Sequence, residues 1–104
     1  MLWEINWTIY VEEDFLENDF SDGEILKAKE RVELASQFPS RLKKVYGFPK
    51  GYDVRRVRYK DFRIFLLLNW LAEKMDCLRM FPDHKGYEKK SVNQILTVIQ
   101  KTSN

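Results

Sequence analysis

Cysteine and histidine are scarce in this chain of 104 residues, in which Cys77 and His84 are the single residue of each type. A lone cysteine excludes an internal disulfide bond. One cysteine and one histidine also exclude a set of metal ligands of the zinc type. We therefore expect no metal and no other cofactor, and the absence of disulfides fits a reducing compartment such as the cytoplasm.

Long apolar runs are also missing. The longest one, Ile64 to Leu68, has five residues, whereas a membrane-spanning helix needs about 20. Residues 1–4 lack the basic start of a signal peptide. We expect no association with a membrane, and the length fits a single domain, residues 1–104, with one modest core.

One sign of charge is scarce in each part of the chain: basic residues are few in residues 1–40, and acidic residues are the minority in residues 41–104. Residues 1–40 contain three basic and ten acidic residues, a net charge of −7, whereas residues 41–104 contain fifteen basic and six acidic residues, a net charge of +9. Such a division can place positive potential on one face, which suits a phosphate-bearing partner. It is equally compatible with two halves that neutralise each other across the fold, and the sequence leaves both readings open.

The first part of the chain has one β pattern and one clear helix start. Leu2 to Val11 alternates apolar and polar residues and is predicted as a strand with one buried face. Glu12 to Phe20 is acidic with few apolar residues, and we predict a short helix or an irregular connection there. Ser21 and Glu24 match the S-x-x-E capping box, so a helix should follow them.

Proline and glycine divide the middle of the chain. Pro39 cannot continue a helix interior, so the helix that follows the capping box is expected to end near Gln37. Pro39 is expected to open a second short helix, from Ser40 to Tyr46, which Gly47 stops.

Three segments in the second half have strand character. They are Tyr52–Lys60, Phe62–Trp70 and Met75–Phe81, separated by short turns, and they predict an antiparallel meander. The middle segment is apolar on both parities and fits a central strand covered on both faces. Its alternative is a buried helix over Phe62–Met75. Ser91 to Lys101 has the spacing of an amphipathic helix, so the sequence predicts an α+β fold with an N-terminal strand, a helical pair, a three-stranded antiparallel meander and a C-terminal helix.

Three short motifs carry a resemblance to a known family. They are Val54 to Tyr59 (VRRVRY), Phe62 to Phe65 (FRIF), which is similar to a Y-R-[IV]-[FLY] strand motif, and His84 to Tyr87 (HKGY). Together with the order of the elements, they make the chain resemble the RelE/ParE superfamily of type II toxin-antitoxin toxins. The resemblance implies a small RelE-like fold whose open antiparallel sheet meets RNA in the ribosome, where ribonuclease members cut messenger RNA without a metal. It also implies a cognate antitoxin protein as a partner.

The resemblance implies catalytic roles for Arg63, His84 and Tyr87. Metal-free RNA cleavage needs a deprotonated 2′-hydroxyl, a stabilised phosphate charge and a protonated 5′ oxygen. The Arg63 guanidinium can hold two phosphate oxygens, or it can pair with the acidic N-terminal half. His84 can transfer protons near neutral pH, or it can be a solvated loop residue. Tyr87 can stack on a base or assist proton transfer, or it can pack against the closing helix.

Basic residues form a predicted RNA-binding cradle around these positions: Arg55, Arg56, Arg58, Arg79 and Lys85. Neighbouring residues on a strand point to opposite faces of the sheet. Either Arg56 with Arg58 or Arg55 therefore points into the cleft, and we favour Arg56 and Arg58.

Three functions are compatible with these observations. The first is a ribosome-dependent, metal-independent endoribonuclease that cleaves messenger RNA as the toxin of a type II toxin-antitoxin system. The second is a ParE-like toxin that inhibits DNA gyrase without catalysis, and the third is an unrelated small α+β binding protein. The presence of Arg63, His84 and Tyr87 favours the first, because a pure inhibitor needs no proton-transfer residue.

Overall fold

The computed structural model describes residues 3–83 and 87–102, with only the backbone of residues 87–90. Within these residues, five strands form one sheet: β1 (Glu4–Trp7), β2 (Lys43–Lys44), β3 (Asp53–Tyr59), β4 (Phe62–Asn69) and β5 (Lys74–Pro82). The helices of the same residues are α1 (Ile9–Glu17), α2 (Asp22–Ala35), the 3-10 turn η1 (Pro39–Arg41) and α3 (Tyr87–Thr102). This α+β order confirms the predicted fold class.

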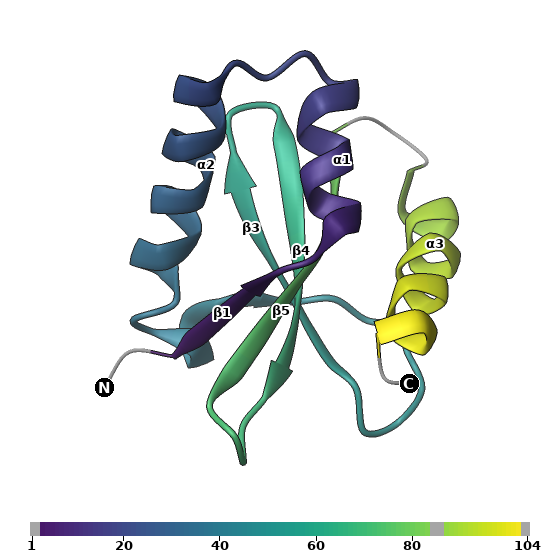
Figure 1. Cartoon of the computed structure of the whole chain (residues 1–104). Helices are drawn as coiled ribbons and strands as arrows, with labels where there is room; N and C mark the ends of the chain where they lie inside the picture. The colour runs from purple at the N-terminus through teal and green to yellow at the C-terminus, as the bar shows by residue number, and fades with distance from the viewer. Residues whose placement is uncertain (1–2, 84–86, 103–104) are drawn as a thin grey trace.

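The strands lie in the order β1-β5-β4-β3-β2. The three long strands β3, β4 and β5 form the predicted antiparallel meander, while β1 pairs in parallel with β5 and the short β2 pairs with the other edge of the meander (Figure 1). The alternative of a buried helix over Phe62–Met75 is therefore wrong. None of the helices that the structure describes is long and apolar enough to cross a membrane.

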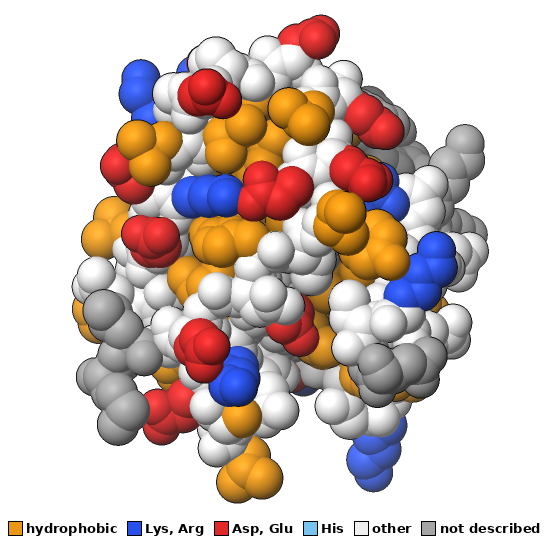
Figure 2. Space-filling view, viewed as in Figure 1, with side chains coloured by type: hydrophobic (Ala, Val, Ile, Leu, Met, Phe, Trp, Pro, Cys, Tyr) orange, Lys and Arg blue, Asp and Glu red, His pale blue; other side chains and the backbone are white. Residues whose placement is uncertain are grey.

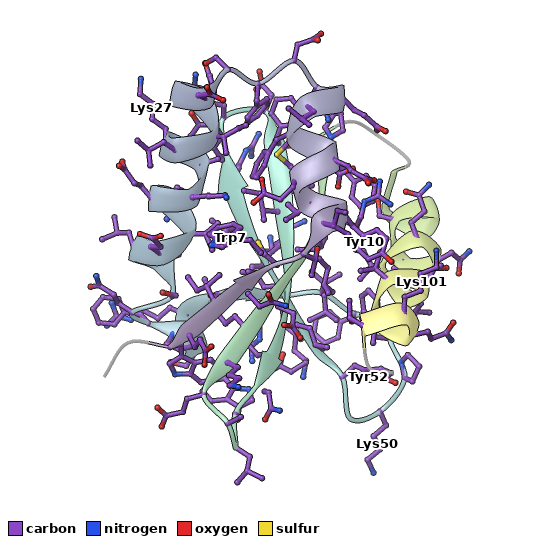
Figure 3. The ribbon with its side chains drawn as sticks, viewed as in Figure 1. Trp7, Tyr10, Lys27, Lys50, Tyr52 and Lys101 are labelled. Carbon is purple, nitrogen blue, oxygen red and sulfur yellow. The ribbon has the colours of Figure 1, made fainter. Side chains whose placement is uncertain are left out.

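Helices cover both faces of this sheet. On one face, α1 and α2 contribute the buried residues Val11, Phe15, Ala28 and Val32 to a core with Ile64 and other strand residues. On the other face, α3 contributes Ile95, Val98 and Ile99 to a second core with Val54, Phe65 and Leu78. The two apolar parities of β4 thus serve two cores, as expected of a central strand. Figure 3 shows Lys101 of α3 near Tyr10 of α1, and the Lys101 ammonium lies 5.7 Å from the Tyr10 ring centroid.

The N-terminal strand is shorter than predicted, because Thr8 ends it. The Thr8 hydroxyl accepts a hydrogen bond from the Val11 amide at 3.4 Å and donates one to the Cys77 carbonyl at 2.7 Å. The first bond caps the start of α1, and the second fixes that start to β5. The prediction of a strand through Val11 is wrong for residues 9–11, where a local cap outweighs the alternating pattern. The short helix predicted within residues 12–20 exists, but it begins at Ile9 and ends at Glu17.

The capping box at the start of α2 is half formed. The Ser21 hydroxyl accepts a hydrogen bond from the Glu24 amide at 3.2 Å, as predicted. The Glu24 carboxylate instead accepts hydrogen bonds from Lys60 and Tyr59. These bonds tie the helix start to the β3–β4 turn.

The segment after α2 departs from the prediction. The helix ends at Ala35, and Pro39 opens only the single turn η1. The predicted helix from Ser40 to Tyr46 is wrong, because Lys43 and Lys44 pair with Arg56 and Arg55 at the sheet edge. This pairing depends on residues distant in the chain, which the local pattern did not reveal.

The closing helix α3 is longer than predicted. It begins at Tyr87, four residues before the capping-box candidate Ser91, which is a buried residue within the helix. Its apolar stripe packs on the sheet as the spacing indicated.

Candidate functional site

The α3 face of the sheet carries the predicted arginines of β3 and β4 other than Arg55. Arg56 and Arg58 share the parity of Val54, which packs in the α3 core, and Arg63 shares the parity of Phe65 in the same core. Arg58 and Arg63 are direct neighbours across β3 and β4. Arg56, Arg58 and Arg63 therefore share one side of the sheet, whereas the expectation that this side is the RNA-binding cleft stays a prediction.

Asp83 links two of these arginines. Its Oδ2 lies 2.9 Å from Nη2 of Arg58, and its Oδ1 lies 2.9 Å from Nη2 of Arg63. The Asp83 amide also donates a hydrogen bond of 2.7 Å to the carbonyl of Asp61, which fixes the chain just after β5. The side chains of Arg63 and Asp83 are about one-sixth exposed, whereas that of Arg58 is 64% exposed. One carboxylate is therefore gripped by two guanidinium groups at a site open to solvent on the Arg58 side.

Asp83 was missed as a site residue by the sequence analysis. A proline-aspartate pair after a strand is typical of a turn. The available signal was its position: Asp83 follows the end of β5, and Pro82 pairs with Phe62, the neighbour of Arg63. The position of Asp83 beside Arg63 can be inferred only once the strand register is known.

Arg55 lies on the opposite face. It donates to both carboxylate oxygens of Asp53, at 2.6 and 3.1 Å, and to the carbonyl of Leu42 at 2.9 Å. Burial opposes ionisation of Asp53, but hydrogen bonds from Arg55 and Trp70 outweigh it and lower the pKa of this carboxyl. Arg55 is thus part of a network that joins the sheet to the segment before β2, and the structure does not bring it to the arginines of the α3 face.

Arg79 is held by a buried carboxylate. A bulge in β5 places Arg79 opposite Phe65, on the α3 side of the sheet. Its guanidinium lies 2.7 and 3.0 Å from the oxygens of Asp14, a residue of α1 that is 4% exposed. The Met80 amide donates to the same carboxylate at 2.8 Å. Arg79 therefore fixes α1 to the sheet, and its guanidinium also lies over the ring of Phe81, 4.6 Å from the ring centroid.

The remaining predicted residues lie outside what the structure describes. His84 and Lys85 follow Asp83 in the undescribed residues 84–86, and Tyr87 begins α3 with an undescribed side chain. Asp83 and α3 bracket this segment.

A cavity of about 310 Å³ adjoins Arg56. It lies between the edge strand β2 and the start of α3, and Arg56 and Phe65 form part of its wall. Among the described residues, no group of three or more His, Cys, Asp or Glu side chains is placed to hold a metal ion.

Comparison with known proteins gives a match in structure and none in sequence. No protein-family model and no curated protein matches the chain. A chain of the archaeal RelE–RelB complex from Pyrococcus horikoshii OT3 superimposes with a TM-score of 0.65 and 16% identity, covering 83% of this chain and 100% of the other. A chain of the toxin-antitoxin complex RelBE2 from Mycobacterium tuberculosis gives a TM-score of 0.59 and 16% identity, covering 79% of this chain and 92% of the other. The chain therefore has a RelE-like fold.

Proposed function

We propose that this protein is the toxin of a type II toxin-antitoxin system and that it cleaves messenger RNA on the ribosome. The RelE-like fold supports a toxin role, since the similar solved structures are RelE–RelB and RelBE2 complexes. The observation that carries the proposed chemistry is the convergence of Arg58 and Arg63 on the two oxygens of the Asp83 carboxylate.

The Asp83 carboxylate marks where a phosphate would bind. A phosphodiester presents two non-bridging oxygens that carry one negative charge, much as a carboxylate does. Guanidinium groups bind both kinds of anion through charge-assisted hydrogen bonds. RNA would displace Asp83 and place a phosphate between Arg58 and Arg63.

Within this arrangement, each proposed residue has a separate role. Arg63 is the less exposed arginine of the pair, so its charge is less screened by water and better suited to stabilise the developing charge on the phosphate. Arg56 and Arg58 hold the RNA backbone. We assign His84 to proton transfer and Tyr87 to base stacking or proton transfer, and Lys85 adds positive charge beside them. Arg55 and Arg79 are left out of this proposal, because both are bonded within structural networks.

The proposed partners bind the face of the sheet that carries the arginines of β3 and β4. Messenger RNA in the ribosome would meet the arginines of β3 and β4, and a cognate antitoxin would block access to them. The neighbours in the structural comparison are toxin-antitoxin complexes, which supports a partner of this kind. The proposed site of action is the cytoplasm, where ribosomes translate.

The function is tested by adding the purified protein to a coupled translation extract and mapping messenger RNA ends by primer extension. We expect new 5′ ends within the translated region, and none when the ribosomes are omitted. Intact transcripts together with arrested growth in cells would contradict cleavage and favour a ParE-like toxin that inhibits gyrase. Intact transcripts without arrest would favour an unrelated binding protein.

A further inference from the structure

β1 has an outer edge whose main chain is not paired with another strand. Within the described residues β1 is the end strand of the sheet, and its inner edge pairs with β5 (Figure 1). The amides of Glu4 and Thr8 donate toward β5, at 3.1 and 3.3 Å. Because alternate residues of a strand turn their amide and carbonyl groups to opposite edges, those of Ile5 and Trp7 face outward. Main-chain donors and acceptors therefore lie along the free edge of β1.

A groove of about 490 Å³ opens beside this edge, on the face of the sheet that α1 and α2 cover. Its floor is formed by Trp3, Ile5 and Trp7, which share one parity and pack against the core under these helices. Its other wall is the second half of α2 and the residues that follow it: Glu30, Glu33, Leu34, Ser36 and Gln37. A chain that paired with β1 would thus place alternate side chains in the groove.

The wall of the groove is acidic and apolar. Glu30 and Glu33 are the charged side chains among the described residues that line it, and no Lys or Arg is among them. Leu34 lies beside them and is 60% exposed. Figure 2 shows acidic and apolar side chains together on the face of the molecule that carries β1 and α2. These charges favour a ligand that is basic as well as apolar.

Neighbouring side chains hold the floor of the groove in place. The rings of Trp3 and Trp70 meet edge to face, with their centroids 4.8 Å apart. The Lys29 ammonium lies 5.1 Å from the centroid of Trp7, and Figure 3 shows Trp7 reaching from β1 toward α2. Lys29 is itself paired with Glu12 of α1. The floor is therefore ordered before any ligand arrives, which lowers the entropy cost of binding.

An extended basic peptide fits these features better than a second copy of the chain or an RNA. The main-chain groups of an edge strand are best satisfied by another extended chain. Two copies paired through β1 would bring two acidic grooves side by side, and like charges in an interface oppose association. The phosphates of an RNA would meet the same repulsion.

We propose that the outer edge of β1 and the groove beside it bind an extended segment of a protein partner by strand addition. The main chain of the partner bonds with that of Ile5 and Trp7. An apolar side chain enters the groove, and a Lys or Arg beside it pairs with Glu30 or Glu33. The groove lies on the face opposite the arginines of β3 and β4, so a bound segment leaves them accessible. The inference therefore stands apart from the proposed ribonuclease function.

The first test selects random short peptides displayed on phage for binding to the purified protein. We expect the enriched peptides to combine Lys or Arg with β-branched or aromatic residues. The best peptide is then synthesised with a fluorophore and titrated by anisotropy. Only alternate amides of an added strand face β1, so methylation of one alternate set should weaken binding at least about tenfold. Methylation of the other set should leave the affinity within about twofold.

The second test removes the acidic wall. Glu30→Gln together with Glu33→Gln is expected to weaken binding of this peptide about three- to twentyfold, because exposed ion pairs contribute on that scale. The matched control is Glu13→Gln together with Glu17→Gln, which removes the same charge from exposed residues of α1 that do not line the groove. The control pair should bind within about twofold of the unmodified protein.

Several outcomes would overturn strand addition at β1. They are the absence of enriched peptides, the enrichment of acidic ones, equal sensitivity of the two sets of amides, and equal losses in the two pairs of variants. Displacement of the peptide by single-stranded RNA would place it on the arginine face instead. Sedimentation of the protein as a dimer that excludes the peptide would assign the edge to a second copy.

Discussion

At the scale of single residues, the main feature is the carboxylate of Asp83 between two arginines. It neutralises part of the charge of Arg58 and Arg63 and holds their guanidinium groups close together. Two guanidinium cations that contact the same carboxylate would otherwise repel each other. The same contact competes with any phosphate that approaches, so Asp83 both organises the proposed site and lowers its affinity for RNA.

Replacing Asp83 with asparagine separates these two effects. Asp83→Asn is expected to tighten binding of single-stranded RNA several-fold, because no ion pair has to break first. The free energy of unfolding is expected to fall by about 1–2 kcal/mol, because two charge-assisted hydrogen bonds at a partly exposed site are weakened. Anisotropy and chemical denaturation measure the two quantities. Asp61→Asn, an exposed neighbour with the same change of charge, is the control, and equal gains in both variants would show a general charge effect.

At the scale of elements, the sequence predicted the parts whose signals are local. The three strands of the meander have alternating patterns separated by turns, and the start of α2 has its own cap at Ser21. The pattern failed where a distant contact decides the structure. Thr8 ends β1 through a bond to Cys77, and β2 exists only because it pairs with β3.

The candidate site likewise has features that local patterns predicted and features that they did not. Alternation placed Arg56 and Arg58 on one face, since parity is a local property of a strand. That Arg63 lies on the same face follows from the register of β3 and β4. The partners of these side chains are set by register and by the bulge in β5, which no local pattern reveals. Sequence reasoning therefore missed the place of Asp83 between two arginines and the bond from Arg79 to Asp14.

The position of α1 depends on that buried bond. β1 pairs with residues 74–77 of β5, so the strand beyond Cys77 has no partner from β1. Asp14 occupies this edge by accepting from the Met80 amide and from Arg79. The Asp14 carboxylate therefore accepts a hydrogen bond from the part of the β5 edge that β1 does not pair with, and it fixes α1 in place.

Asp14→Ala is expected to lower the free energy of unfolding by about 2–4 kcal/mol, because it leaves an amide and a largely buried guanidinium without their acceptor. Urea denaturation followed by circular dichroism measures the change. Glu13→Ala, an adjacent acidic residue of α1 that is exposed, should change stability by about 0.5 kcal/mol or less. A loss below about 1 kcal/mol for Asp14→Ala would contradict the structural role of the pair.

At the scale of the whole molecule, the division of charge along the chain becomes a division in space. The acidic first part supplies α1 and α2, and Figure 2 shows acidic side chains spread over the face of these helices. Ion pairs such as Asp14–Arg79 and Glu24–Lys60 link this layer to the sheet. Arg56, Arg58 and Arg63 lie on the opposite face. Both interpretations of the charge division hold in part. The two halves neutralise each other through these ion pairs, and a group of arginines still lies on the α3 side.

Stability at acid pH should reflect the Asp53 network, which joins β3 to Trp70 and, through Arg55, to the segment before β2. The pKa of Asp53 is lowered on folding, so its contribution is present above the ordinary pKa of aspartate and is lost as the pH falls below it. Asp53→Asn is expected to cost about 1–2 kcal/mol at neutral pH, and this difference should shrink below about pH 4. Denaturation curves of both proteins across this pH range measure it. A difference that does not vary with pH would contradict an ionised Asp53 as the source.

The most direct test of the proposed function compares Arg63→Ala with Arg31→Ala in the translation extract. Arg31 is an exposed arginine of α2, on the face opposite the proposed site, so both variants lose the same charge and side chain. Circular dichroism first establishes that both are folded. We predict that Arg63→Ala cuts messenger RNA at least about a hundredfold more slowly and that Arg31→Ala cuts at the rate of the unmodified protein. Equal cleavage by Arg63→Ala and the unmodified protein would contradict the account.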